Sequence, residues 1–139
     1  MGTATKQAIL KMNYLLDTNV VINYLDGSLP VSGMQLLNTI VDDAPMISII
    51  TKMETLGYNF TSIDEQTTLE TFINGSTILD LNNDIVNKTI DIKKGKKIKL
   101  PDAIIAATAI VYDLVLVSRN ISDFKNISGI NVIDPHDLK

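Results

Sequence analysis

Hydrophobic residues occur along the chain in two alternating patterns, short continuous runs and longer stretches with helical spacing. The longer stretches predict helices, because their apolar residues recur at every third or fourth position. The short runs predict five strands, at residues 14–16, 46–50, 77–81, 114–118 and 130–133. Strands that alternate with helices in this way are typical of an α/β domain with a parallel sheet.

Four acidic residues lie where predicted strands end or predicted helices begin. In open parallel sheets, ligands bind beyond the carboxyl ends of the strands, so acids placed there face one site. Four carboxylates without lysine partners repel one another, and a pocket that keeps them ionised usually holds a hard cation such as Mg²⁺ or Mn²⁺. Such a cation suits the hydrolysis of phosphodiester bonds. The four acids are Asp17, Glu54, Asp102 and Asp123.

Each of these acids also has a purely structural interpretation. Residues 51–54 (TKME) have the form of a capping box, in which Glu54 would accept a hydrogen bond from the backbone of the cap residue. Local sequence alone favours that interpretation. Asp17 could cap the helix that follows it, and Asp102 could compensate a helix dipole. Asp123 could order a turn.

The charge of the chain is unevenly distributed. The net charge is −4, which by itself argues against a nucleic-acid partner. Six of the 12 basic residues, however, lie within residues 88–99, where Asp91 is the only acid, so this lysine arm carries +5. A basic arm on an acidic body suits phosphate contacts beside a metal site, although it could also be a solvated helix end.

The length and composition of the chain indicate one soluble domain. At 139 residues the chain can bury a hydrophobic core, and it contains no cysteine, which fits a reducing cytoplasm. It has no apolar run of the roughly 20 residues that a membrane span needs, so no membrane partner is expected. Residues 1–11 show no motif, and we expect them to be a leader or an added extension outside the fold. The single histidine, His136, is expected at the surface.

Four segments of the sequence form a specific combination by their order. They are residues 15–19 (LLDTN), 49–54 (IITKME), 100–109 (LPDAIIAATA) and 116–124 (LVSRNISDF). Together they resemble the signature segments of PIN-domain ribonucleases, especially VapC-type toxins, and the resemblance runs from about residue 12 to residue 135. It implies a PIN-like three-layer domain over residues 12–139, with a five-stranded parallel sheet flanked by helices.

The resemblance also implies a function and its residues. It implies RNA cleavage with Mg²⁺ or Mn²⁺, a cytoplasmic homodimer, and inhibition by a cognate antitoxin. It overrules the capping-box interpretation of Glu54. As catalytic and metal-binding residues it implies Asp17, Glu54, Asp102 and Asp123. As candidate RNA-binding residues we take Lys94, Lys96, Lys97, Lys99 and Arg119.

The fourth acidic position stays open between two residues. Many relatives have an aspartate where this chain has Asn120, whereas others use the acid at the position of Asp123. Asn120 could bind a metal or a phosphate only as a neutral group, which disfavours a tightly held second metal. Ligating carboxylates normally need polar groups that orient them. We expect those groups to be Thr18, Asn19, Ser118 and Asn120.

Other classes of protein share parts of this pattern. A phosphoacceptor receiver domain would need a lysine at the end of its last strand, and residues 130–135 contain none. A phosphatase with an aspartate nucleophile would want a second acid where Asn19 stands. The main alternative is a weakly active or inactive PIN-like module that acts as a regulatory or protein-binding partner. RNA cleavage that is absent in Asp17→Ala would distinguish the nuclease from this module.

Overall fold

The structure of the chain, a computed structural model, describes residues 13–138. The expected leader, residues 1–11, lies outside the described residues. The strands are β1 (Tyr14–Leu16), β2 (Met46–Ser48), β3 (Thr77–Leu79), β4 (Val115–Val117) and β5 (Asn131–Ile133). The helices are α2 (Thr18–Leu25), α3 (Val31–Asp42), α4 (Ile49–Leu56), α5 (Ile63–Asn74), α6 (Asn83–Gly95), α7 (Leu100–Val111) and α8 (Ile121–Phe124). Within residues 13–138, no helix is long and apolar enough to cross a membrane.

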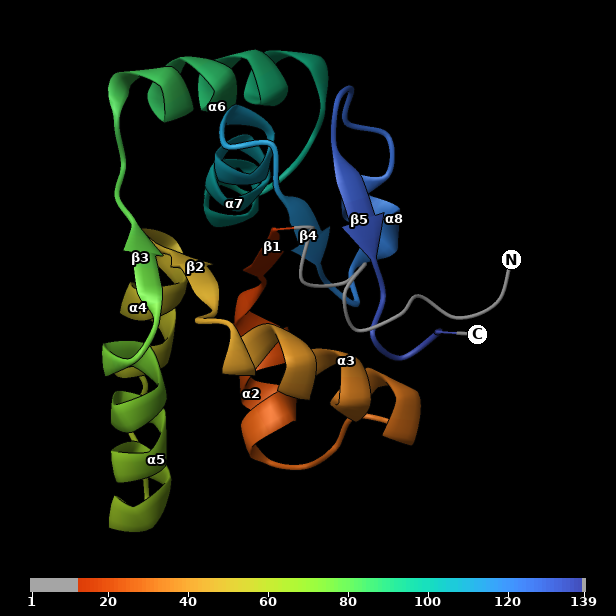
Figure 1. Cartoon of the computed structure of the whole chain (residues 1–139). Helices are drawn as coiled ribbons and strands as arrows, with labels where there is room; N and C mark the ends of the chain where they lie inside the picture. Colours follow the sequence, from red (N-terminus) through yellow and green to blue (C-terminus); the bar gives the residue numbers. More distant parts are fainter. Residues whose placement is uncertain (1–12, 139) are drawn as a thin grey trace.

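The strand β1 forms the centre of a single sheet (Figure 1). The strand order is β3-β2-β1-β4-β5, and every pair is parallel, which confirms the predicted five-stranded parallel sheet. The chain builds one half of the sheet outward from β1 through β2 and β3, and then the other half through β4 and β5. The order therefore reverses between β1 and β4. Ligands bind beyond the carboxyl ends of the strands at such a reversal.

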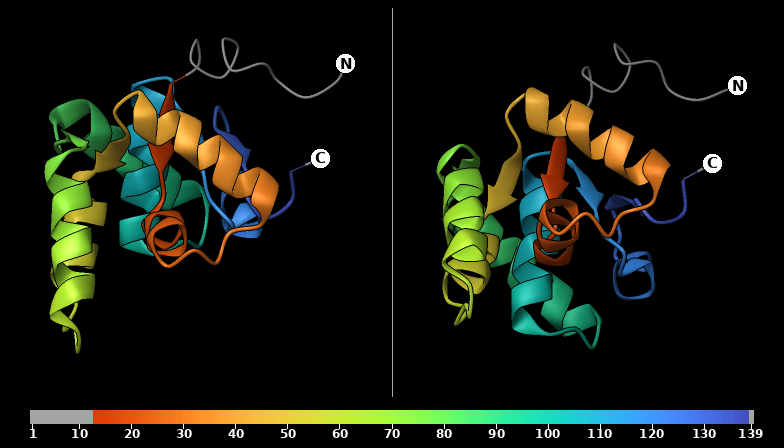
Figure 2. Two further views of the ribbon diagram at one scale, coloured as in Figure 1. Left: turned by 60° about the horizontal axis from the view of Figure 1, so that its bottom comes forward. Right: turned by 90° about the horizontal axis from the view of Figure 1, so that it is seen from below.

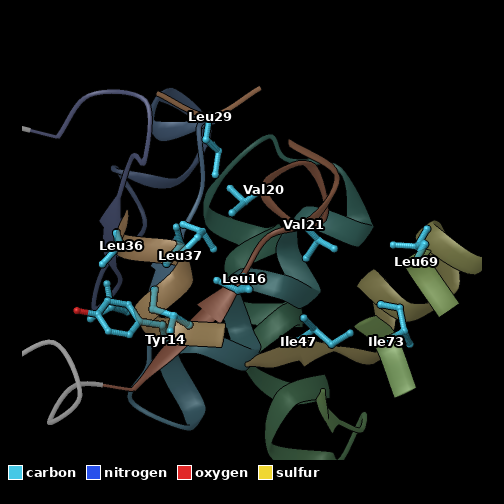
Figure 3. Packing of buried hydrophobic residues seen from close by; sticks show 13 residues of the cluster. Tyr14, Leu16, Val20, Val21, Leu29, Leu36, Leu37, Ile47, Leu69 and Ile73 are labelled. Atoms are coloured by element: carbon cyan, nitrogen blue, oxygen red, sulfur yellow. The ribbon is translucent and has the colours of Figure 1, made fainter. Parts of the chain in front are cut away.

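Helices cover both faces of the sheet, so the domain has three layers (Figures 1 and 2). One hydrophobic cluster joins one face to α2, α3 and α5, and a second cluster joins the other face to α6, α7 and α8. Along β1, Tyr14 and Leu16 belong to the first cluster, whereas Leu15 belongs to the second. Figure 3 shows the first cluster, with Leu16 near its centre. A strand that is buried on both faces needs an apolar residue at each position, which explains the continuous run.

The helix α7 is packed against α6 and the sheet, as its apolar residues on every side predict. Ala103 and all five residues from Ile105 to Ala109 are buried. The small alanine side chains allow neighbouring elements to approach this helix closely, and the packed core restricts its movement. Asp102, in the first turn of α7, is consequently presented from a well-anchored helix end.

The start of α4 differs from the prediction. The apolar run at residues 46–50 predicts one strand, but β2 ends at Ser48 and α4 begins at Ile49. The Ser48 hydroxyl accepts a hydrogen bond from the backbone N–H of Ile50, so Ser48 caps the helix. The capping-box interpretation of residues 51–54 is therefore wrong. Thr51 and Glu54 both lie inside α4, three positions apart and hence on the same side of the helix.

Candidate functional site

Asp17 lies at the carboxyl end of β1 and is 7% exposed. It is the N-cap of α2, and its Oδ1 accepts a hydrogen bond of 2.8 Å from the backbone N–H of Thr18. Its Oδ2 accepts a bond of 2.7 Å from the Ser118 hydroxyl. Burial raises the pKa of the Asp17 carboxyl above its ordinary value of 3.8, the two hydrogen bonds lower it, and the charge of Glu54 raises it. The structural interpretation of Asp17 as a helix cap is thus correct, and it does not exclude a metal role.

Ser118 connects the ends of the two strands between which the strand order reverses. The residue is fully buried and directly follows β4. Its oxygen accepts a bond of 3.0 Å from the backbone N–H of Asn120 while its hydroxyl donates to Asp17. A hydroxyl has only one proton, so this arrangement commits that proton to the Asp17 carboxylate. Ser118 thereby orients the Asp17 carboxylate.

Glu54 extends from α4 and is exposed. Its Oε1 accepts a hydrogen bond of 2.7 Å from the Thr18 hydroxyl, which connects α4 to the start of α2. Thr18 therefore uses its backbone N–H to support Asp17 and its side chain to support Glu54. The sequence predicts Thr18 as an orienting group for Asp17, and it does not predict this second contact with Glu54.

Asp102 is the carboxylate on which the other three acids act. Partial burial is the largest cause that raises the pKa of Asp102 above its ordinary value of 3.8. The negative charges of Asp17, Glu54 and Asp123 raise this pKa further, while Lys99 lowers it. Such influence requires proximity, because charge interactions weaken with distance and are screened by solvent. The structure thus brings all four predicted acids to one end of the sheet.

Asn120 and Asp123 form a hydrogen-bonded pair. The Asn120 amide donates a bond of 2.7 Å to Asp123 Oδ2, and both residues belong to the segment that follows β4. Asp123 is the exposed member of the pair and contributes to the negative field at Asp102. Asn120 therefore orients Asp123, whereas the metal-binding role of either residue stays a prediction.

The oxygen-rich composition of this site fits a hard divalent cation. The charges of Asp17, Glu54 and Asp123 raise the pKa of Asp102, and the charge of Lys99 opposes them there. Within residues 13–138, however, no three acidic or histidine side chains converge closely enough to hold one ion together. Mg²⁺ usually keeps several waters and binds through one or two carboxylates, so this spacing suits Mg²⁺ or Mn²⁺ with water in the remaining positions.

The lysine arm borders the acidic site. It consists of the second half of α6 and the connection to α7, and the Lys93 ammonium donates a hydrogen bond to the Ile98 carbonyl across that connection. Lys99 directly precedes α7 and acts on Asp102. In the right-hand view of Figure 2, the α6–α7 connection lies at the end of the molecule toward which β1 points. The positive charge is therefore on the same side of the molecule as the acids.

Arg119 and Asn19 are predicted site residues, whereas Thr51 is a residue near the site that was not predicted. Arg119 and Asn19 are both exposed, and within residues 13–138 the side chain of Asn19 makes no hydrogen bond to Asp17. The sequence pattern does not identify Thr51 as a site residue, yet its hydroxyl lies 3.0 Å from that of Thr18. Once the capping-box interpretation is rejected, the spacing of Thr51 and Glu54 on one side of α4 is the sequence feature that could have identified Thr51.

The metal-free protein is expected to become less stable as the pH rises above the ordinary aspartate pKa. The folded state holds protons on Asp17 and Asp102 at pH values where the unfolded chain has lost them, because both pKa values are raised on folding. These two groups therefore lower the free energy of unfolding as the pH rises through that interval. Thermal melts in a chelator, recorded from acidic to neutral pH, measure this. Asp102→Asn should show a weaker decline, and an identical decline in both proteins would contradict the prediction.

A family model and similar solved structures agree on the family to which this chain is related. The sequence model of the PIN domain matches residues 14–130. A toxin–antitoxin complex from Klebsiella pneumoniae contains a chain with 31% identity and a TM-score of 0.69, and the match covers 91% of this chain and 100% of that one. A DNA-bound VapBC from Salmonella typhimurium gives 28% identity and a TM-score of 0.73, with 89% and 98% covered.

A third similar structure supports the fold alone. VapBC2 from Rickettsia felis, bound to a DNA fragment from its promoter, gives 24% identity and a TM-score of 0.74. The match covers 88% of this chain and 98% of that one. Among curated proteins, none matches the sequence.

Proposed function

Because the chain belongs to the PIN-domain family, we propose that it is a metal-dependent endoribonuclease that hydrolyses phosphodiester bonds of RNA with Mg²⁺ or Mn²⁺. The observation that carries the proposal is the influence of the charges of Asp17, Glu54 and Asp123 on Asp102 at the carboxyl end of the sheet. Carboxylates that repel one another in the free protein are relieved by a bound divalent cation. The reversal of strand order between β1 and β4 supports a ligand site at this edge of the sheet, because ligands bind at such reversals.

The proposed roles of the side chains follow from their contacts. Asp17, Glu54 and Asp102 would hold the cation, one or two of them directly and the rest through its bound water, with Asp123 at the edge of the site. A cation bound there would neutralise the carboxylates, orient a phosphate group and stabilise the developing charge of the leaving oxygen. Ser118 keeps Asp17 in place, and Asn120 keeps Asp123 in place. The alternative is a weakly active or inactive regulatory module with the same fold.

RNA cleavage by the purified chain tests this proposal. We expect wild type to cut single-stranded RNA with Mg²⁺ or Mn²⁺ and to stop when a chelator is added. Asp17→Ala serves as the control for a contaminating nuclease, because it removes one proposed ligand. Absence of cleavage with either metal, or equal cleavage by Asp17→Ala, would overturn the proposal and favour the regulatory module.

The lysine arm is proposed to attract the RNA backbone, since the rest of the chain is acidic. Replacing Lys96 and Lys97 with Gln should weaken RNA binding without changing metal affinity. Each phosphate contact on a single strand contributes about 0.7 to the slope of log affinity against log salt. The double variant should flatten that slope by roughly 1 to 1.5 units if both lysines contact phosphate.

A matched control separates this effect from net charge. Lys52→Gln combined with Lys125→Gln removes the same charge outside the arm, and both lysines are exposed. Fluorescence-anisotropy titrations at several salt concentrations measure the slopes. Equal slopes for wild type and the Lys96/Lys97 variant would mean that the arm is a solvated surface only.

The similarity to toxin–antitoxin complexes supports a second part of the proposal. We propose that the chain is the toxin of such a pair, that it forms a homodimer in the cytoplasm, and that a cognate antitoxin protein inhibits it. Exposed apolar side chains on α4 and α6 offer surface for these contacts, namely Met53, Leu56, Val86 and Ile90.

Light scattering should give twice the monomer mass for the chain alone. Addition of a candidate antitoxin should increase the mass and suppress RNA cleavage, and a monomer that no candidate inhibits would contradict this part.

A further inference from the structure

Three side-chain oxygen atoms from α2 and α4 lie in a row beside the site. Thr51 Oγ1 is 3.0 Å from Thr18 Oγ1, and Thr18 Oγ1 is 2.7 Å from Glu54 Oε1. Thr51 is fully buried, Thr18 is half-buried and Glu54 is exposed. The row thus runs from the interior of the protein to the acidic site.

The direction of these hydrogen bonds follows from counting protons. An ionised carboxylate can only accept, so the bond to Glu54 uses the single hydroxyl proton of Thr18. The contact between the two hydroxyls then requires Thr51 to be the donor and Thr18 to be the acceptor. Because the Thr51 hydroxyl is excluded from solvent, water cannot easily replace it in that role. Thr51 therefore holds Thr18 in the orientation that points its proton at Glu54.

Glu54 needs such support more than Asp17 and Asp102 do. Asp17 is buried and has two hydrogen-bond donors, and Asp102 is placed by the first turn of a packed helix. Glu54 has a longer side chain on an exposed helix position, and glutamate has among the largest losses of rotamer freedom on being fixed. Thr18 provides the side-chain hydrogen bond that restrains it.

We propose that Thr18 and Thr51 are a hydroxyl pair that positions Glu54 for the reaction, with Thr51 acting through Thr18. This inference rests on the proposed nuclease function. Both threonines are positioning residues, since Thr51 is fully buried and the Thr18 side chain acts through its hydrogen bond to Glu54. In this proposal Thr51 has a role in the site, and the Thr18 side chain supports Glu54 and not Asp17.

Valine substitutions test the pair, because valine has nearly the shape of threonine and lacks only the hydroxyl. Thr18→Val keeps the backbone N–H that supports Asp17 and removes the bond to Glu54. Loss of a group that orients a metal ligand typically costs about 10- to 100-fold in activity or metal affinity. We expect Thr18→Val to lower kcat and Mg²⁺ affinity within that range, with KM for RNA unchanged. Thr51→Val should change the same quantities less, since Thr18 keeps its proton for Glu54.

Serine and a neighbouring threonine provide the controls. Thr18→Ser and Thr51→Ser restore each hydroxyl and should recover most of the lost activity, which a general packing role would not predict. Thr55 is the matched control, because it is buried on the same helix and its hydroxyl donates to the backbone carbonyls of Thr51 and Lys52. Thr55→Val should leave kcat and Mg²⁺ affinity unchanged.

A measurement on the metal-free protein tests the inference without an assay of catalysis. Three-bond NMR couplings report whether the Glu54 side chain occupies one χ1 rotamer or averages over several. We expect a single rotamer in wild type and averaging in Thr18→Val. Thr51→Val should show partial averaging, and Thr55→Val should match wild type.

The outcomes separate this inference from the proposed function. If wild type cleaves RNA but Thr18→Val retains its kcat and its Glu54 rotamer, the positioning pair is wrong and the nuclease stands. Thr51→Val that behaves like Thr55→Val in both measurements would remove Thr51 from the pair. If wild type does not cleave RNA, the proposed function fails, and an unchanged Glu54 rotamer in Thr18→Val would then also overturn the contact itself.

Discussion

Asp102→Asn is expected to lower RNA cleavage by about a thousandfold or more. A bound cation supplies several kcal/mol of transition-state stabilisation, and each loss of about 1.4 kcal/mol costs tenfold in rate. Asparagine keeps the size of the side chain but removes the charge that would attract the cation. Single-turnover cleavage of a labelled RNA with Mg²⁺ or Mn²⁺ measures the effect. Turnover equal to that of wild type would remove Asp102 from the metal site.

The stability of this variant provides the control. In the metal-free protein Asp102 is partly buried beside three other carboxylates, so removal of its charge should keep or raise the melting temperature. A lost activity with a strongly lowered melting temperature would instead indicate a damaged fold. Asp17→Asn should also abolish cleavage, but it is a less clean substitution. An amide cannot accept bonds from both Thr18 and Ser118 through two oxygens as the Asp17 carboxylate does.

Glu54→Gln is expected to reduce cleavage by about a hundredfold or more, by the same loss of charge at the metal. Glutamine retains an oxygen that can accept the Thr18 hydrogen bond, so the melting temperature should change little. Cleavage assays and thermal melts, made on the same preparations, separate the two properties. Wild-type cleavage with a lowered melting temperature would make Glu54 a purely structural residue.

This variant also has an electrostatic consequence that can be measured without metal. The charge of Glu54 raises the pKa of both Asp17 and Asp102, so its removal should lower both values. The decline of stability with rising pH should therefore be weaker in Glu54→Gln than in wild type. An unchanged pH dependence would mean that Glu54 lies too far from the two aspartates to act on them.

The lengths and types of most elements follow from local patterns, which the sequence carries directly. The run at residues 14–16 is continuously apolar because both faces of β1 are buried, and the same holds for β4. The apolar character of α7 predicts its burial, which the structure confirms. The positions of Asp17, Asp102 and Asp123 beside strand ends or helix starts are also properties of the sequence, whereas Glu54 lies inside α4. Parallel strands present those ends on one edge of the sheet, so the acids could be predicted to share it.

Prediction from local patterns was wrong where a polar side chain could have either of two structural roles. Residues 51–54 have the spacing of a capping box, but the same spacing places two side chains on one face inside a helix. The choice depended on where α4 begins, and Ser48 decided it by capping the helix three residues earlier. Ile49 and Ile50 have the β-branched character of a strand, yet the cap places them in the first turn of α4.

By itself, the sequence determined the α/β class, the succession of strands and helices, and the placement of Asp17, Asp102 and Asp123 at their ends. Only the tertiary structure decided which strands are neighbours and which polar groups meet. Ser118 and Asp17 are 101 positions apart, and their hydrogen bond exists because β1 and β4 are adjacent. Thr18 reaches Glu54 because α2 and α4 both begin at the same edge of the sheet. The physical reason is that local periodicity reports which face of an element is buried, whereas the partner across that face is selected by the packing of the whole core.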